Sequence, residues 1–322
     1  MCKHIPQEGI ENFYDVFAGG CAITNEMLKQ NKYKHYYVND LNGQGVQLFI
    51  NAIKGKYRNE RRWISREDFF ALKDTDPYVS ICWSFGNNQK TYLYNKDIEE
   101  YKKAIFEAIV YDNFTNVERL FPFKWGEYQQ TIKNITDIYG RKLKICGQIK
   151  KIIRNSGGLS LFETNMSKDV CVLTNQVVEP LERLRRLTNL QNLEATIRLQ
   201  NLEATRLDYR DVLIRPNSVV YCDIPYKGTD GYKVEEGFCH EDFYDWCNEQ
   251  DELVLISEYD MPRDRFKVVW EIEKRALFSQ NSNKTVVERL FVPIKQLGKY
   301  DALMSQDKHL RNKKRKELTL FG

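Results

Sequence analysis

The chain has 322 residues, of which 42% are hydrophobic and 29% are charged, and its formal net charge is +4. This length suits one large domain or two modest ones, and the apolar fraction is sufficient for an ordinary core. The segment MCKHIPQEG lacks the apolar stretch of a signal peptide, and no run of apolar residues is long enough to span a membrane. The eight cysteines are scattered without a CxxC pair, so we expect reduced thiols and no metal site.

The first part of the chain alternates between strand and helix patterns. The expected elements are strands over 13–17 and 35–40 and helices over 24–30 and 46–57. Thr24 or Asn25 is the expected cap of the first helix, because short polar side chains satisfy the free N–H groups of a helix start. This order favours an α/β fold with a doubly wound parallel sheet.

Between about residues 43 and 205 the pattern changes, and charged, aromatic, mostly helical segments dominate. Residues 97–114 predict one helix, and residues 125–158 predict one or two more that end at Gly157 and Gly158. Further elements are expected as strands over 219–226, 252–259 and 286–292 and a helix over 240–250. The sheet is therefore expected to be interrupted by a long helical insertion.

Residues 183–207 contain the sequence QNLEAT twice, and leucine recurs in this region at every third position from Leu181. An α-helix turns about 300° in three residues, so such a row drifts around the helix instead of marking one face. A helix buried on several sides, a tight three-per-turn coil and a low-complexity spacer all remain open. We favour a spacer or packing role and assign this segment no chemistry.

Two distant segments carry most of the functional information. The first, FYDVFAGGCAIT, places a glycine pair between a strand and a helix, where the backbone can approach a ligand because no Cβ intervenes. The second, SVVYCDIPYKG, ends a predicted buried strand with Asp223, Ile224, Pro225 and Tyr226. A carboxylate, a rigid carbonyl and an aromatic face at one sheet edge can hold a planar amine.

These segments resemble the FxGxG and (D/N)PP(Y/F) motifs of the S-adenosylmethionine-dependent amino-methyltransferases. Their order, together with the segments VNDLN and LDY, most resembles the Dam-like DNA adenine methyltransferases, including those carried by phages. The resemblance implies a Rossmann-like methyltransferase sheet, S-adenosylmethionine as cofactor, and target recognition by the helical insertion. Two departures are visible, since Cys21 replaces the third glycine and the N-terminal GGK-type segment of many relatives is absent.

By this resemblance, a set of residues around the glycine turn and the second strand would bind the cofactor. Asp15, Phe17 and Gly19 would line its methionine end, Asp40 would accept the ribose hydroxyls, and Asp208 and Tyr209 would contact its adenine ring. The complete expected set is Asp15, Phe17, Gly19, Gly20, Cys21, Asp40, Asp208 and Tyr209. For Asp208 alone, a cap or turn residue is the competing interpretation.

The expected chemistry is methyl transfer to an exocyclic amine whose lone pair is delocalised into a ring. Two acceptors improve this nucleophile by drawing its hydrogens, and here they would be the Asp223 carboxylate and the carbonyl of Ile224 or Pro225. Tyr226 would stack on the extruded base. Ile224 stands where the family usually has proline, and we expect activity to survive because a β-branched residue remains stiff.

Basic clusters mixed with aromatic residues fit contact with a phosphate backbone. One such cluster spans 54–66 and another spans 308–318, and the loop 83–96 supplies amides that could read base edges. The expected DNA-binding residues are Lys54, Lys56, Arg58, Arg61, Arg62, Asn87 and Asn88. A solvated helix face, a terminal tail and an ordinary surface loop are the competing interpretations.

The expected domain organisation follows these motifs. It comprises a cofactor part at 1–53, a target-recognition insertion at 54–180, a spacer at 181–206, a catalytic part at 207–305 and a basic tail at 306–322. The leading hypothesis is a site-specific methyltransferase that acts on N6 of a flipped adenine in duplex DNA, as a monomer or weak dimer in a bacterial or phage-infected cytoplasm. The alternatives are an enzyme for RNA adenine or a protein amide, and an inactive DNA-binding relative.

Overall fold

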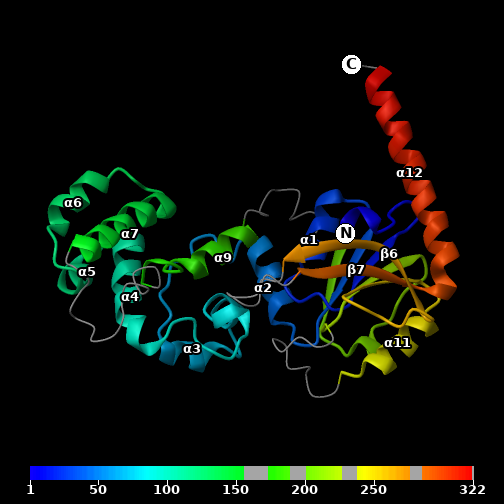
Figure 1. Cartoon of the computed structure of the whole chain (residues 1–322), viewed down its shortest axis with the longest axis horizontal. Helices are drawn as coiled ribbons and strands as arrows, with labels where there is room; N and C mark the ends of the chain where they lie inside the picture. The colour runs from blue at the N-terminus through cyan, green and yellow to red at the C-terminus, as the bar shows by residue number, and fades with distance from the viewer. Residues whose placement is uncertain (156–172, 189–200, 227–237, 276–284, 321–322) are drawn as a thin grey trace. The chain divides into compact units, whose positions relative to one another are not determined.

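The computed structural model describes residues 1–155, 173–188, 201–226, 238–275 and 285–320. The chain divides into two compact units, one formed by Met1–Lys54 with Gln191–Gly322 and the other by Gly55–Leu190. Figure 1 labels the elements of both units. The first unit contains the sheet, and the second consists mainly of helices.

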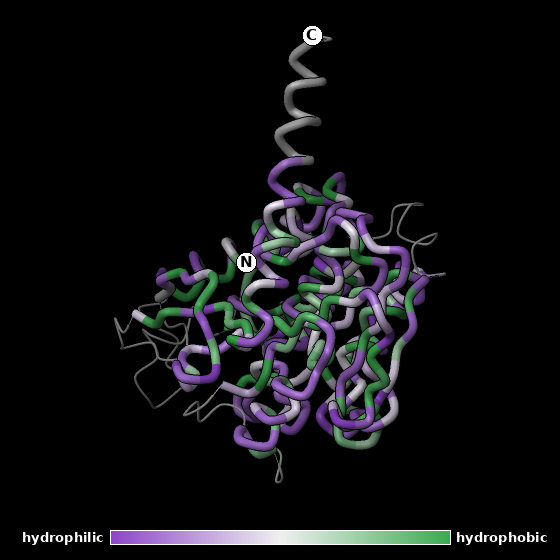
Figure 2. The backbone as a smooth tube through the Cα atoms, turned by 90° about the vertical axis from the view of Figure 1, so that its right-hand side faces the viewer, coloured by the Kyte–Doolittle hydropathy of each residue, from purple (hydrophilic) through white to green (hydrophobic). Residues whose placement is uncertain are grey.

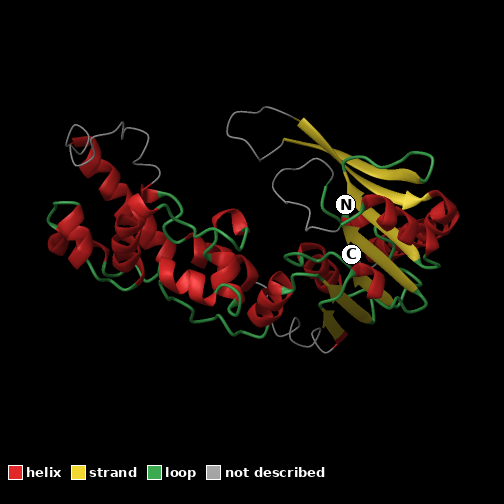
Figure 3. Ribbon diagram, turned by 90° about the horizontal axis from the view of Figure 1, so that it is seen from below, coloured by secondary structure: helices red, strands yellow, loops and turns green. Residues whose placement is uncertain are grey.

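The first unit is built on a seven-stranded sheet with the order β3-β2-β1-β4-β5-β7-β6 (Figure 3). Its strands are β1 (Asn12–Asp15), β2 (His35–Asn39), β3 (Leu202–Thr205), β4 (Ser218–Asp223), β5 (Leu253–Glu258), β6 (Phe266–Arg275) and β7 (Thr285–Pro293). The first five strands of this order (β3, β2, β1, β4 and β5) run parallel to one another. Strand β7 is antiparallel to both β5 and β6. The order of the strands reverses between β1 and β4, and ligands of such sheets bind at the carboxyl ends beside this point.

The sequence prediction of a parallel sheet is confirmed for five strands and wrong for the last two. Strands β6 and β7 follow one another as an antiparallel pair, so no helix is needed to carry the chain back across the sheet. Strand β3 lies within the expected spacer over 181–206, so the expectation for residues 202–205 is wrong. It forms a short strand at the sheet edge with mostly exposed side chains, which leaves little hydrophobic signal in the sequence.

Helices cover both faces of the sheet. They are α1 (Ala22–Gln30), α2 (Gln44–Ile53), α11 (His240–Glu249) and α12 (Leu297–Leu320). On one face, Val220 and Val254 of the central strands belong to the same buried cluster as Phe243 of α11. On the other face, the Tyr36 hydroxyl donates to the Met27 carbonyl of α1. Figure 2 shows hydrophobic stretches of backbone running through this unit, and burial of their side chains supplies its main stabilisation.

Helix α12 runs from the sheet into the basic segment that was expected to be a tail. Its backbone is helical to Leu320. The Asp307 carboxylate accepts the backbone N–H groups of Gln7 and Glu8, at 3.3 and 2.8 Å, and therefore ties this helix to the start of the chain. None of the helices in the described residues is both long and apolar enough to cross a membrane.

The second unit contains six α-helices in its described residues. They are α3 (Arg66–Leu72), α4 (Lys96–Val110), α5 (Thr115–Leu120), α6 (Trp125–Ile132), α7 (Ile138–Asn155) and α9 (Glu179–Thr188). Large buried aromatic side chains, among them Trp83, Phe106 and Trp125, form much of its interior. Helix α4 ends at Val110, earlier than the predicted Phe114. The segment predicted to form one or two helices from residue 125 onwards contains two, α6 and α7.

The leucine row is only partly visible. Leu181 and Leu184 lie buried on α9, so the start of the row is a packed helix and not a spacer. The positions Leu190, Leu193 and Leu199, together with the expected stop at Gly157 and Gly158, lie outside the described residues.

Candidate active site

The two functional segments meet at the carboxyl edge of the sheet. Strand β1 pairs in parallel with β4, with Asp15 opposite Tyr221, and the Val16 N–H donates to the Tyr221 carbonyl. Strand β4 then pairs with β5, with Asp223 opposite Ser257. The glycine turn after β1 and the Asp223 segment after β4 are therefore neighbours at the switch point, where an α/β sheet can bind a ligand.

The glycine turn is fixed by Asp40. The Gly19 N–H donates to Asp40 Oδ2 at 2.8 Å, and Oδ1 accepts the N–H groups of Asn42 and Gly43 at 3.0 and 3.3 Å. A Cβ on Gly45 would lie 2.0 Å from the Gly19 carbonyl oxygen, so only glycine lets α2 begin this close to the turn. The two loops thus form one rigid corner.

Cys21 explains why the related motif has glycine at its position. Its φ of 59° lies in the left-handed region, where a side chain is disfavoured, and it is fully buried. Cys21 also precedes the first residue of α1 and serves as its N-cap position. The predicted caps Thr24 and Asn25 are therefore wrong by about one turn, because the turn closes earlier than the sequence pattern suggested.

Asp15 lies beneath this turn with only 2% of its surface exposed. Its Oδ2 accepts the Thr24 hydroxyl at 2.6 Å and the Thr24 N–H at 3.3 Å. Burial raises the pKa of Asp15 to about 7; the hydrogen bonds from Thr24 oppose this shift, while the charges of Asp223 and Asp40 add to it. Three carboxylates, from the ends of β1, β2 and β4, therefore influence one another here.

Asn39 links the strands that carry the predicted cofactor-binding residues. Its Nδ2 donates to the carbonyls of Val16 and Leu207, at 3.1 and 3.0 Å. Its Oδ1 accepts the Thr205 hydroxyl at 2.8 Å and the Leu207 N–H at 2.9 Å. All four hydrogen-bonding positions of this buried amide are used, so it holds the ends of β1, β2 and β3 in register.

Asp208 and Tyr209 follow directly from this junction. The Tyr209 ring lies 5.5 Å from the ring of Phe17 and 5.5 Å from that of Phe243, within the buried cluster over α11. Asp208 caps a short 3-10 helix, and both of its oxygens accept from the Arg210 guanidinium at 2.8 and 2.9 Å. These hydrogen bonds lower the pKa of Asp208. The cap interpretation of Asp208 is therefore confirmed.

The Asp-Ile-Pro-Tyr segment is held by residues from β5 and α11. The Tyr226 hydroxyl lies 2.8 Å from Ser257 Oγ, and its ring packs edge-on against Tyr259 at a centroid distance of 4.5 Å. The Pro225 carbonyl oxygen lies 3.2 Å from His240 Nε2. Ile224 is buried, whereas Asp223 is exposed at the strand end. The segment thus presents a carboxylate and an aromatic ring on a fixed backbone.

The glycine turn and the acidic strand end lie in a part of the chain that is similar to a known family. The family model for the D12 class N6 adenine-specific DNA methyltransferases matches residues 1–152. Residues 1–152, out of 322, are therefore similar to this family of DNA adenine methyltransferases. No curated protein sequence matches the chain. The matched range includes the glycine turn and Asp40 but ends before Asp223, so the roles of the later residues depend on their own geometry.

The predicted DNA-binding residues are exposed. Lys56, Arg58, Arg61 and Arg62 line an open pocket of about 500 Å³ in the second unit, beside Tyr111. Arg62 pairs with Glu60 at 2.8 Å and with Asp76 at 3.2 Å, whereas Lys56, Arg58 and Arg61 have no carboxylate partner among the residues that the structure describes. Lys54, which is also among the predicted DNA-binding residues, belongs to the first unit and is exposed as well.

The two candidate amides, Asn87 and Asn88, lie in an exposed loop of the second unit. Asn88 uses its Oδ1 to accept the N–H groups of Lys90 and Thr91, both at 2.9 Å, and so stabilises the loop itself. Asn87 has a left-handed φ of 61°, and its side chain is exposed. Phe85, in the same loop, is 61% exposed.

Sequence reasoning missed several residues that support this site. Gly45, His240 and Ser257 lie outside the matched segments, and Asn39 lies within VNDLN but had no expected role, although each fixes a motif residue. A polar residue that ends a largely apolar, aromatic strand, as Asn39 does, was a usable signal because buried amides need partners. His240 and Ser257 gave no signal, since only the fold brings them to the Asp223 segment.

Proposed function

We propose that this protein transfers a methyl group from S-adenosylmethionine to the N6 amine of an adenine flipped out of duplex DNA. The observation that carries this proposal is the pairing of β1 with β4, which brings the Gly19–Asp40 corner and the Asp223 segment to one sheet edge. A methyl donor and its acceptor must lie next to each other for such a transfer.

The corner after β1 fits the proposed cofactor. A Cβ placed on Gly19 or Gly20 would meet nothing within 4 Å, so the exposed turn leaves room for a ligand beside its backbone. Asp40 offers carboxylate oxygens for ribose hydroxyls, and Phe17 offers an aromatic wall. Asp208 would have to exchange its bonds with Arg210 to accept from an adenine amine. When bound, the cofactor supplies an electrophilic methyl group on a sulfonium.

Asp223 and one backbone carbonyl would activate the target amine. Both would accept hydrogen bonds from N6 and so make the nitrogen lone pair available for the new N–C bond. As this bond forms, the bond between the sulfonium and its methyl group would break and leave a neutral thioether, and one N6 proton would leave through Asp223 or water. The second acceptor is assigned to the Ile224 carbonyl, because the Pro225 carbonyl already faces His240 Nε2 at 3.2 Å. His240 therefore acts by holding the turn.

Tyr226 would hold the flipped base. A base outside the helix loses its stacking partners, and an aromatic face replaces part of that energy. The hydrogen bond with Ser257 and the contact with Tyr259 restrict the Tyr226 ring. The base would thus meet a ring whose orientation is set before binding.

The second unit is proposed to carry target recognition. Lys56, Arg58 and Arg61 supply exposed positive charge for the phosphate backbone, and Asn87 supplies an exposed amide for a base edge. Arg62 and Asn88 are weaker candidates than the sequence indicated, because their side chains serve Glu60, Asp76 and the loop backbone.

The proposal is tested by offering labelled S-adenosylmethionine with unmethylated duplex DNA, structured RNA and a protein mixture, using Asp223→Ala as the control enzyme. We expect label in the DNA with the wild-type enzyme only. Label in RNA or protein would replace the substrate in this proposal by one of the alternatives. Absence of label in all three, with cofactor binding intact, would indicate an inactive relative.

A further inference from the structure

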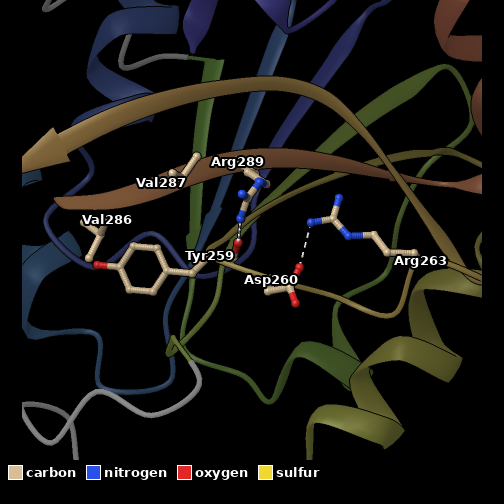
Figure 4. A pocket seen from close by; sticks show the side chains of 6 residues that line it. All are labelled: Tyr259, Asp260, Arg263, Val286, Val287 and Arg289. Atoms are coloured by element: carbon tan, nitrogen blue, oxygen red, sulfur yellow. Dashed lines mark hydrogen bonds and ion pairs between the residues drawn. The ribbon is translucent and has the colours of Figure 1, made fainter.

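An open pocket of about 510 Å³ lies next to the catalytic segment and is shown in Figure 4. We call it the Tyr259 pocket, and it is lined by Tyr259, Asp260, Arg263, Val286, Val287 and Arg289. Tyr259 and Asp260 directly follow β5, and the other strand residues lie at the start of β7. Because β7 is antiparallel to β5, its first residues lie at the sheet edge where β5 ends. This is the edge that carries Asp223.

Tyr259 separates this pocket from the place proposed for the target adenine. Its ring contacts the Tyr226 ring at 4.5 Å, and it also lines the pocket, whereas Tyr226 and Asp223 do not. The pocket is therefore a neighbouring space and not the target site itself. A ligand there would lie one aromatic ring away from Tyr226.

The charges of the Tyr259 pocket do not suit a phosphate. Arg263 donates to Asp260 at 2.7 Å, and Arg289 donates to Glu271 at 3.0 Å and also to the Tyr259 carbonyl. Each guanidinium thus has a carboxylate partner. The pocket beside Lys56 differs, because several of its cations have no such partner among the described residues.

The shape of the lining suits a nucleobase. The Tyr259 ring and the side chains of Val286 and Val287 supply flat or apolar surface, and Figure 4 shows the ring directed towards Val286. At the rim of the pocket, 74% of the Asp260 side chain and 51% of the Arg263 side chain are exposed. Because both side chains are accessible, they can exchange the hydrogen bond between them for hydrogen bonds with a ligand. A base has the same combination of apolar faces and a polar edge.

We propose that the Tyr259 pocket binds the base of a nucleotide adjacent to the target adenine, stacked against Tyr259 and recognised at its edge by Asp260 and Arg263. This inference rests on the proposed function. It makes part of the sequence specificity a property of the catalytic unit, in addition to the helical unit. Arg263 would favour a base edge that accepts hydrogen bonds, and Asp260 one that donates them.

The test compares kcat/KM on DNA duplexes that contain one mapped methylation site and each of the four bases at the two flanking positions. We expect Asp260→Asn and Arg263→Met to change the ratio between bases at one flanking position by roughly tenfold, as for a lost base-edge contact. Cofactor affinity should stay unchanged. Asp264→Asn is the matched control, since Asp264 is an exposed neighbour that does not line the pocket. Unchanged ratios at both positions in both variants would overturn the proposal.

A binding experiment separates this inference from the proposed function. Duplex DNA with 5-iodouracil beside an adenine is irradiated with the full-length protein, and the attached peptide is identified. We expect attachment at Tyr259, and its loss in Tyr259→Leu. Attachment without any methylation would refute the proposed function and keep the pocket. Methylation with attachment elsewhere only would refute the pocket and keep the function.

Discussion

The side chains at the sheet edge of the first unit are held differently from those on the basic surface of the second unit. At the sheet edge, polar groups are held by buried partners, as Asp15 is by Thr24 and Tyr226 by Ser257. On the basic surface, Lys56 and Arg58 are exposed around an open pocket. Chemistry requires fixed geometry, because misplaced groups lose most of their effect. Attraction of a phosphate backbone requires charge, which tolerates mobile side chains.

The largest effect of this contrast is expected on stability, at Asp15. Because its pKa is raised to about 7 by burial, the unfolded chain loses this proton at lower pH than the folded chain. Its contribution is therefore most favourable below about pH 4 and is lost as the pH rises through 7. Asp15→Asn should raise the free energy of unfolding at pH 8 by roughly 4 kcal/mol and flatten its pH dependence. Denaturation at pH 4 and pH 8 measures this, and an equal change at both pH values would contradict it.

The next effect concerns the rate, at Asp223. Asp223→Asn removes the charged acceptor of the target amine, and kcat should fall at least about 100-fold, as for other preorganised groups. The fold and the cofactor affinity should be unchanged. Asp251→Asn is a control at an exposed carboxylate that precedes β5, away from the catalytic edge. A variant that retains more than a tenth of the wild-type kcat would rule out this role.

The effect at Asp40 should appear in cofactor binding. Asp40→Ala removes the acceptor for the Gly19 N–H and the proposed acceptor for the ribose, so the cofactor Kd should rise roughly 10- to 100-fold. Calorimetry with S-adenosylhomocysteine measures this loss, and a fluorescence titration with DNA provides the comparison. A larger loss in DNA affinity than in cofactor affinity would be incompatible with the assignment.

A smaller effect on kcat is expected where Ser257 positions Tyr226, compared with removal of the Tyr226 ring that would contact the base. Tyr226→Phe and Ser257→Ala each remove one side of the same hydrogen bond, and each should lower kcat about fivefold. Because both changes break the hydrogen bond that the two residues share, their losses should multiply only in part in the double variant. The Tyr226 hydroxyl also interacts with Asp223, and Ser257 also interacts with Tyr221. Fully multiplied losses in the double variant would show that Ser257 acts in another way. Tyr226→Ala, which removes the ring as well, should reduce kcat far more.

The smallest single effects are expected on the basic surface. Lys56→Ala, Arg58→Ala and Arg61→Ala should each weaken DNA binding a few-fold and reduce the slope of log Kd against log salt by about one. Arg62→Ala is the matched control and should leave this slope unchanged, because Glu60 and Asp76 already balance its charge. A slope change in Arg62→Ala equal to the others would mean that local pairing does not decide the DNA contacts.

Much of the sheet edge could be predicted from the sequence because its motifs are local. The strand, turn and helix from Phe13 to Gln30 are encoded by neighbours, and the strand ending at Asp223 is a continuous apolar run. Strand β3 could not be predicted in this way, because it is short and mostly exposed and depends on a partner strand. Strand β6 is absent from the expected elements, although its alternation of apolar with charged residues is a usable strand signal.

The contacts that hold the Asp223 segment could not be predicted from the sequence for a related reason. His240 meets Pro225, and Ser257 meets Tyr226, only after strands β4 and β5 have paired. The basic cluster was visible as composition. Composition did not reveal that Arg62 is paired with carboxylates, whereas Lys56 and Arg58 have no such partner in the described part of the chain. Tertiary pairing thus decides which of several similar residues is available for function.

The most direct test of this account is nucleoside analysis of duplex DNA after incubation with wild-type enzyme and S-adenosylmethionine. The sheet edge described here predicts N6-methyladenine as the methylated nucleoside, and its loss with Asp223→Asn. A methyl group on cytosine, or N6-methyladenine formed equally by Asp223→Asn, would contradict it.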